Sequence, residues 1–253
     1  MSNLHPAAAG LDQLFQISEH SHGLADAAEG NLTAPVEHCP GWTVADLVAH
    51  LIDVHWFWTT IADGPLAEPP DNDRRPGRVP DDELTATLRA GADRLVAVLS
   101  DTDLTAPAWT WAPAAQTVGF IQRHQVQEAA VHHWDAVHAA GDTLALPADV
   151  AVDAIEEFLT YSVSTPTDPA DPVRPPLDGT LVLHATDVDA AWTVTDAEPS
   201  GTIQFRRGAD ETAPTVAATA SDLLLWIYRR VELPLDPATQ ELVSRLRSLS
   251  YTD

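Results

Sequence analysis

In several segments between positions 7 and 162, apolar side chains recur every three to four residues, the spacing that places them on one face of an α-helix. In the first such segment, 7–29, the apolar stripe is formed by Leu11, Leu14, Phe15 and Ile17. The same pattern predicts further helices over residues 44–63, 81–99, 117–140 and 147–162. Residues 64–80, rich in Pro, Asp and Arg, are predicted to be a loop. The first part of the chain is therefore predicted to be all-helical.

The helix over 44–63 has a well-marked start. Thr43 is a suitable N-cap residue, and Asp46 three positions later makes a variant of the capping box. The positions expected to face inward in this helix and the next are Val44, Leu47, Val48, Leu51, Val54, Trp58, Leu84, Leu88, Leu95 and Leu99.

The pattern changes after residue 163. Residues 164–178 hold five prolines, which is typical of a linker. Beyond them, alternating apolar and polar residues predict strands over 180–186, 191–196 and 202–207, and helical spacing returns over 219–231 and 241–249. These boundaries predict a helical domain over 1–163, a Pro-rich linker over 164–178 and a small α+β domain over 179–253.

Charge and composition narrow the function classes. The chain of 253 residues has 38 acidic and 13 basic residues, a net charge of −25, which disfavours binding to the phosphate backbone of nucleic acids. No apolar run reaches the length of a membrane span, and the N-terminus lacks the pattern of a signal peptide, so we expect a cytoplasmic protein. All basic residues are arginines, and an anionic small-molecule substrate would need one or two of them.

The helix over 117–140 carries a cluster of titratable residues. Glu128 and His132 are four residues apart and share a helix face, with His124 one turn earlier and Asp135 one turn later, whereas His133 points about 100° away. A carboxylate and an imidazole at this spacing suit a divalent metal. A surface ion pair between Glu128 and His132 is the alternative.

A third ligand is available on another helix. His50 lies between Leu47 and Leu51 and should face inward, while His55 is turned about 140° from it. Metal sites in helical bundles take ligands from facing helices, and three protein ligands with an open position are typical of catalytic zinc. The alternative for His50 is a hydrogen-bonded core histidine.

The single cysteine, Cys39, excludes an intramolecular disulfide. Extending the helix axis back from His50 places Cys39 ~16 Å away, so we expect it to be badly placed for catalysis. A thiol nucleophile, if one is used, should then come from a small molecule.

Segments 39–51 (CPGWTVADLVAHL) and 127–136 (QEAAVHHWDA) resemble the mycothiol-dependent maleylpyruvate isomerase family of the DinB-like metalloenzyme superfamily. Segments 146–159, 181–187 and 219–230 also resemble this family. The resemblance implies a DinB-like four-helix bundle followed by a small α+β C-terminal domain.

Position by position, the resemblance assigns the metal ligands to His50, Glu128 and His132. Family members often carry a histidine where this chain has Gln127, which puts a substrate role at that position in doubt. Asp135 is a candidate acceptor for the N–H of a ligand histidine.

The reaction implied by the resemblance uses mycothiol, the actinobacterial sugar thiol, at a zinc or similar divalent ion. The thiolate would add to an electrophilic substrate, giving either cis–trans isomerisation of a maleylpyruvate-type compound or S-transfer. Candidate arginines for recognising the anion are Arg123, Arg229 and Arg230. Trp42, Trp56, Trp58 and Trp134 are expected in the core and the pocket walls.

Two other functions stay open at this point. One is a metal-dependent hydrolase or lyase on the same bundle that uses no thiol. The other is a non-catalytic protein that binds a metal or another ligand. The sequence leaves open the natural substrate, the choice between isomerase and transferase, and whether the protein is a monomer or a dimer.

Overall fold

The computed structural model describes residues 10–163, 174–250 and 252. The chain divides into two compact units, with the division between Ala145 and Leu146. Each unit is described by itself below. The predicted fold class, a helical N-terminal region followed by a small region of strands and helices, is confirmed.

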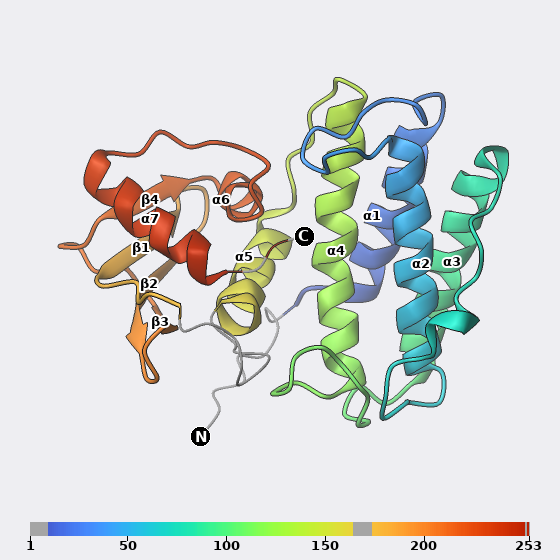
Figure 1. The fold of residues 1–253 in the computed structure, drawn as a ribbon, viewed down its shortest axis with the longest axis horizontal. Helices are drawn as coiled ribbons and strands as arrows, with labels where there is room; N and C mark the ends of the chain where they lie inside the picture. Colours follow the sequence, from blue (N-terminus) through green and yellow to red (C-terminus); the bar gives the residue numbers. More distant parts are fainter. Residues whose placement is uncertain (1–9, 164–173, 251, 253) are drawn as a thin grey trace. The chain divides into compact units, whose positions relative to one another are not determined.

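The first unit is a bundle of four helices (Figure 1). Helix α1 packs against α3 and α4, and α2 packs against the same two helices. Two short 3₁₀ turns, η1 and η2, lie between α2 and α3. The bounds of these elements are α1 Gln13–Ala28, α2 Val44–Ala62, η1 Asn72–Arg74, η2 Asp81–Glu83, α3 Leu84–Asp101 and α4 Val118–Ala139.

Local sequence explains where α2 begins and which face it buries. The predicted capping box is present: the Thr43 hydroxyl accepts from the backbone N–H of Asp46, and the Asp46 carboxylate accepts from that of Thr43. All the positions predicted to face inward on α2 and α3 are buried except Val54, which is partly exposed. The buried position beyond it is His55, which has no exposed surface.

The predicted stripe of α1 was wrong at Phe15, whose side chain is 54% exposed. The buried face of α1 instead includes the polar residues His20 and Ser21. Apolar periodicity missed this face because it counts histidine and serine as outward-facing, whereas both form hydrogen bonds to neighbouring helices. The face consists of Ile17, His20, Ser21, Leu24, Ala25 and Ala28.

Helix α4 is buried on almost all sides, although it carries many polar side chains. A helix that is buried all round is normally apolar, because each buried polar group needs a partner. The buried polar residues of α4 are Gln122, Arg123, Gln125, Gln127, His132 and Asp135. This helix is therefore where a functional site is best sought.

The second unit contains a four-stranded sheet with the strand order β3-β2-β1-β4. Strand β2 pairs antiparallel with both β1 and β3, and β4 pairs in parallel with β1. Helix α6 packs on β1 and β4, α7 packs on β1, and α5 packs on α6. The bounds are α5 Ala148–Glu157, the π-helical turn η3 Phe158–Ser162, β1 Thr180–Ala185, β2 Ala190–Ala197, β3 Thr202–Arg207, β4 Thr215–Ala218, α6 Ala220–Ile227 and α7 Pro237–Leu249.

The position of α5 differs from the predicted domain boundary at residue 163. Helix α5 belongs to the second unit, and its buried Glu156 explains why. The Glu156 carboxylate accepts hydrogen bonds from the indole N–H of Trp192 on β2, at 2.9 Å, and from the guanidinium of Arg207 on β3, at 2.6 Å. Most of the predicted linker, residues 164–173, lies outside the described residues.

We expect Glu156→Ala to destabilise the second unit by about 2 to 3 kcal/mol, because it leaves the buried indole N–H of Trp192 without this acceptor. Urea unfolding followed by tryptophan fluorescence measures the loss. Glu241→Ala is the control, since Glu241 forms an exposed ion pair with Arg245 and such pairs contribute little. Equal losses in the two variants would contradict this role for Glu156.

Within the described residues, no helix is both long enough and apolar enough to cross a membrane.

Candidate metal centre

Three side chains from two helices of the bundle converge on one point. Nε2 of His50, on α2, lies 3.1 Å from Oε1 of Glu128, on α4. Nε2 of His132, one turn further along α4, lies 3.5 Å from the same oxygen. The structure therefore brings together the three residues that the sequence indicated as metal ligands, and they form one of the groups of potential ligands among the described residues.

The orientation of His132 is set by Asp135. Nδ1 of His132 donates to Oδ2 of Asp135 at 3.0 Å, which directs Nε2 of the same ring towards Glu128. The Asp135 side chain is fully buried, and the His132 side chain is 6% exposed. A buried carboxylate that holds a histidine in this way is a common feature of metal sites.

The positive charge of a protonated His132 lies between the negative charges of Asp135 and Glu128. Burial by itself lowers the pKa of His132, but the hydrogen bonds and charges of Asp135 and Glu128 outweigh it and raise this pKa to about 9. Burial raises the pKa of Glu128, yet hydrogen bonds from His132 and His50 bring it well below its usual value. Two carboxylates thus hold a positive charge between them, and a divalent cation would take over that position.

The spacing of the donor atoms fits a zinc-like ion. Ligands 2.0–2.1 Å from a tetrahedral zinc lie about 3.3 Å from one another. The distances of 3.1 Å and 3.5 Å from Glu128 to the two imidazoles are close to that value. Two neutral imidazoles and a carboxylate are also a donor set typical of catalytic zinc, which keeps a further position open.

A cavity of about 500 Å³ adjoins the cluster at His50. The indole ring of Trp42, also in its wall, lies 5.1 Å from the imidazole of His50. The remaining lining residues are Gly41, Asp46, Ala49, Ile52, Asp53, Gly77, Arg78, Val79 and Leu84. A small molecule in this cavity would meet an aromatic surface, charged groups and one of the candidate ligands.

The other histidines near these helices have different roles. His55 is buried and shares a hydrogen bond with Ser21, at 3.3 Å. His133 is bonded through Nδ1 to His20 on α1, at 3.1 Å, and so points to a different helix from His132. His124 accepts from Gln127 and stacks on Phe120.

The three arginines proposed from the sequence are not among the residues that line the cavity. Arg123 is buried on α4. Arg229 and Arg230 follow α6 in the second unit, where they donate to the backbone carbonyls of Arg247 and Tyr228. The arginine in the cavity wall is Arg78, which the sequence did not single out because it lies in an irregular segment between α2 and α3.

The expectation that Cys39 lies far from the site was wrong in its geometry. The Cys39 thiol donates to Oδ2 of Asp135 at 4.0 Å, and Asp135 in turn binds His132. The axis argument assumed that α2 extends back to Cys39. Instead the helix begins at Val44, and the preceding residues turn back on themselves through bonds such as that from the N–H of Val36 to the carbonyl of Trp42.

The fold and the site define a helical bundle that carries a two-histidine, one-carboxylate cluster, followed in the chain by a small α+β unit. Residues 16–137 match the family model of the mycothiol maleylpyruvate isomerase (MDMPI) N-terminal domain. Residues 149–241 match the model of the MDMPI C-terminal domain. The two matches span most of the chain, which therefore belongs to the mycothiol-dependent maleylpyruvate isomerase family, a family of enzymes. The C-terminal match includes α5, in agreement with the division of the structure.

Two solved structures resemble the chain over most of its length. A crystal structure of the mycothiol-dependent maleylpyruvate isomerase has a TM-score of 0.55 and 15% identity, and the match covers 89% of this chain and 95% of that one. A crystal structure of a histidine-to-alanine mutant of this isomerase has the same TM-score and coverage, at 14% identity. At these identities the likeness is one of fold. No curated protein matches the chain in sequence.

Proposed function

We propose that this protein is a metal-dependent enzyme that uses mycothiol to isomerise a small cis-enedioyl acid of the maleylpyruvate type. The observation that carries the proposal is the convergence of His50, Glu128 and His132 beside a cavity, in a chain of this family. The same machinery would support S-transfer of the thiol, which is the second outcome to be tested.

In this proposal His50, Glu128 and His132 hold a divalent ion, zinc being the expected one. When bound, such an ion lowers the pKa of a thiol and so supplies a thiolate at neutral pH. Asp135 keeps Nδ1 of His132 protonated and Nε2 free to act as a ligand. The indole ring of Trp42 lies beside the imidazole of His50, where it offers an apolar surface to a bound molecule.

The proposed reaction is a reversible addition. The sulfur of mycothiol forms a bond to one alkene carbon, and the electron pair of the double bond moves to the conjugated carbonyl as an enolate. Rotation about the new single bond follows. The enolate then re-forms the double bond and expels the thiolate, so that the thiol is regenerated and the product differs from the substrate only in configuration.

Arg78 is the cavity residue suited to a substrate carboxylate. Its guanidinium is paired with Asp46 at 2.5 Å, its side chain is 48% exposed, and the residue lines the cavity. We expect Arg78→Gln to raise KM about tenfold with a smaller change in kcat, because one charge-assisted hydrogen bond contributes about 1.5 kcal/mol. Steady-state kinetics test this, with Arg94→Gln as the control for an exposed arginine–aspartate pair outside the cavity. Arg123, Arg229 and Arg230 stay predictions for the same task.

The proposal is tested by supplying mycothiol and maleylpyruvate to the metal-loaded protein and following loss of the cis-enedioyl absorbance. Turnover that requires both the thiol and the metal supports it. Conjugation of mycothiol to an electrophile without isomerisation would favour S-transfer. Hydrolysis without thiol would replace the proposal with the metal-dependent hydrolase or lyase.

A further inference from the structure

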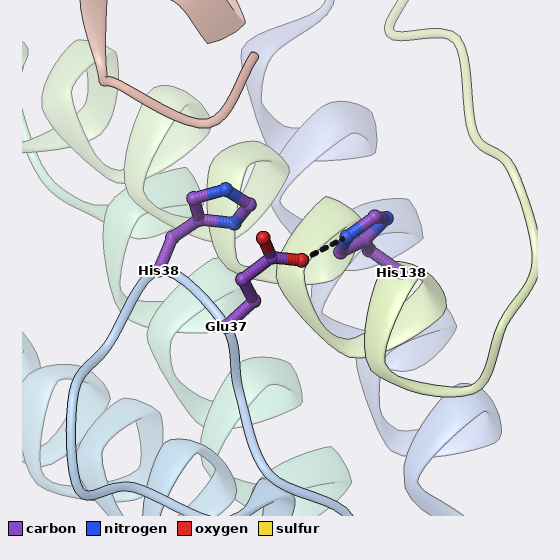
Figure 2. A group of neighbouring side chains, drawn as sticks. All are labelled: Glu37, His38 and His138. Atoms are coloured by element: carbon purple, nitrogen blue, oxygen red, sulfur yellow. Dashed lines mark hydrogen bonds and ion pairs between the residues drawn. The ribbon is translucent and has the colours of Figure 1, made fainter.

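A second group of potential ligands lies at the C-terminal end of α4. It consists of Glu37 and His38, from the segment before α2, and His138, from the last turn of α4 (Figure 2). One ligand atom from each residue lies within 4.8 Å of the other two. Figure 2 shows the Glu37 carboxylate between the two imidazole rings.

The imidazoles of His38 and His138 also contact a residue outside the group. The ring of His138 stacks on Trp134, with centroids 4.6 Å apart and 11° between the planes. The ring of His38 lies 5.7 Å from the same indole. The segment that carries Glu37 and His38 is itself ordered by the backbone bond from Cys39 to Val36. A site whose imidazoles are already restrained loses less entropy when it binds an ion.

The donor chemistry suits a borderline divalent ion. Nε2 of His138 lies 3.0 Å from Oε2 of Glu37, close to the separation of about 3.3 Å between ligands of a tetrahedral zinc. Two imidazoles and one carboxylate favour zinc or its neighbours over magnesium or calcium, which prefer oxygen ligands.

We propose that Glu37, His38 and His138 form a second divalent-metal site, distinct from the cluster of His50, Glu128 and His132. A zinc-like ion there ties the segment before α2 to the end of α4. That segment also carries Cys39, whose thiol contacts Asp135, and Asp135 in turn binds Nδ1 of His132. The ion therefore restrains the contacts that orient His132. The ion stabilises the folded protein, because it binds the folded state in preference to the unfolded chain.

Zinc titration of the chelator-treated protein in 150 mM salt, with a competing chelating dye, tests this proposal. His50→Ala is used as the background because it removes a ligand of the first cluster. We expect this variant to bind one zinc per chain and to gain thermal stability on zinc addition. His50→Ala/His138→Phe is expected to lose both effects, since phenylalanine keeps a ring on Trp134 but offers no ligand.

His50→Ala/His22→Ala is the matched control. His22 forms a bond of 3.0 Å to Asp93, with a side-chain exposure of 36% that is close to the 39% of His138, but it belongs to no group of three ligands in the described part of the chain. This variant should keep its zinc, and Glu37→Gln in the His50→Ala background should weaken binding. Zinc binding that survives in His50→Ala/His138→Phe, or no zinc binding by His50→Ala, would overturn the proposal. The second site can be tested even if the first cluster binds no metal. In that case the wild-type protein binds one zinc, and His138→Phe alone removes it.

Discussion

His50→Ala is expected to remove the metal from the cluster of His50, Glu128 and His132 and to lower thiol-dependent turnover on the order of 1,000-fold. The reason is that the loss of one ligand leaves only Glu128 and His132, from a single helix, to hold the ion. Metal catalysis of this kind contributes several kcal/mol, and about 4 kcal/mol corresponds to that factor. Metal content by elemental analysis and single-turnover kinetics with mycothiol are the two measurements.

His22→Ala serves as the control, because it removes a partly exposed histidine on α1 that pairs with Asp93 on α3 and belongs to no candidate ligand group of the described residues. It should keep both metal and turnover. Glu128→Gln should behave like His50→Ala, since the amide is a weak ligand for zinc. Unchanged metal binding at the cluster after His50→Ala, measured in the His138→Phe background, would show the assignment of the ligands to be wrong.

The free energy of unfolding is expected to fall steeply as the pH is lowered from 6.5 to 4. Burial lowers the pKa of His20 and of His55 from 6.5 to about 4, with the charge of His133 adding to the effect at His20. The unfolded chain therefore binds protons in this range while the folded protein does not. Each histidine removes about 3 kcal/mol, at about 1.4 kcal/mol for each tenfold change in proton affinity.

The sign follows from which state takes up the proton. Well above pH 6.5 neither state protonates His20 or His55, and these two histidines then cost the folded protein no stability. Below about pH 4 both states are protonated, and the folded state then holds two buried charges. Nε2 of His20 and Nδ1 of His55 have no hydrogen-bond partner among the described residues, so a proton there would be poorly solvated.

Urea unfolding at a series of pH values, together with NMR titration of the two imidazoles, measures this effect. His55→Gln should flatten the pH dependence, because glutamine keeps a polar group near Ser21 but does not titrate. Val48→Ala on the same helix is the control and should lower stability by a similar amount at every pH. A pH dependence that is as steep in His55→Gln as in wild type would contradict the prediction.

Helical periodicity accounts for most of what could be predicted. Together with the alternation typical of strands, it located the four helices of the bundle and strands β1, β2 and β3, because each of these elements has a regular spacing that depends only on local sequence. Strand β4, Thr215–Ala218, was not predicted. It also placed Glu128 and His132 on one face of α4 and selected His50 rather than His55 on α2. The structure places His50, and not His55, beside Glu128, and the two histidines point about 140° apart because they are five residues apart on one helix.

Loops and buried polar residues account for what could not be predicted. The distance from Cys39 to the site was misjudged because the chain before Val44 turns instead of continuing as a helix. The group of Glu37, His38 and His138 joins residues about a hundred positions apart, and no local pattern relates them. Arg78, which lines the cavity, was also missed, because it lies in an irregular segment with no periodic pattern.

The sequence by itself determined the elements, the family resemblance and the three candidate ligands, because all of these depend on residue type and on spacing within a helix. Only the tertiary structure decided that α5 packs with the second unit, through the bonds of Glu156 to Trp192 and Arg207. It also decided that His20 and His55 are buried without charge and that Cys39 contacts Asp135. These features are contacts between residues far apart in the sequence, and the local spacing of residues does not indicate which distant segments pack together.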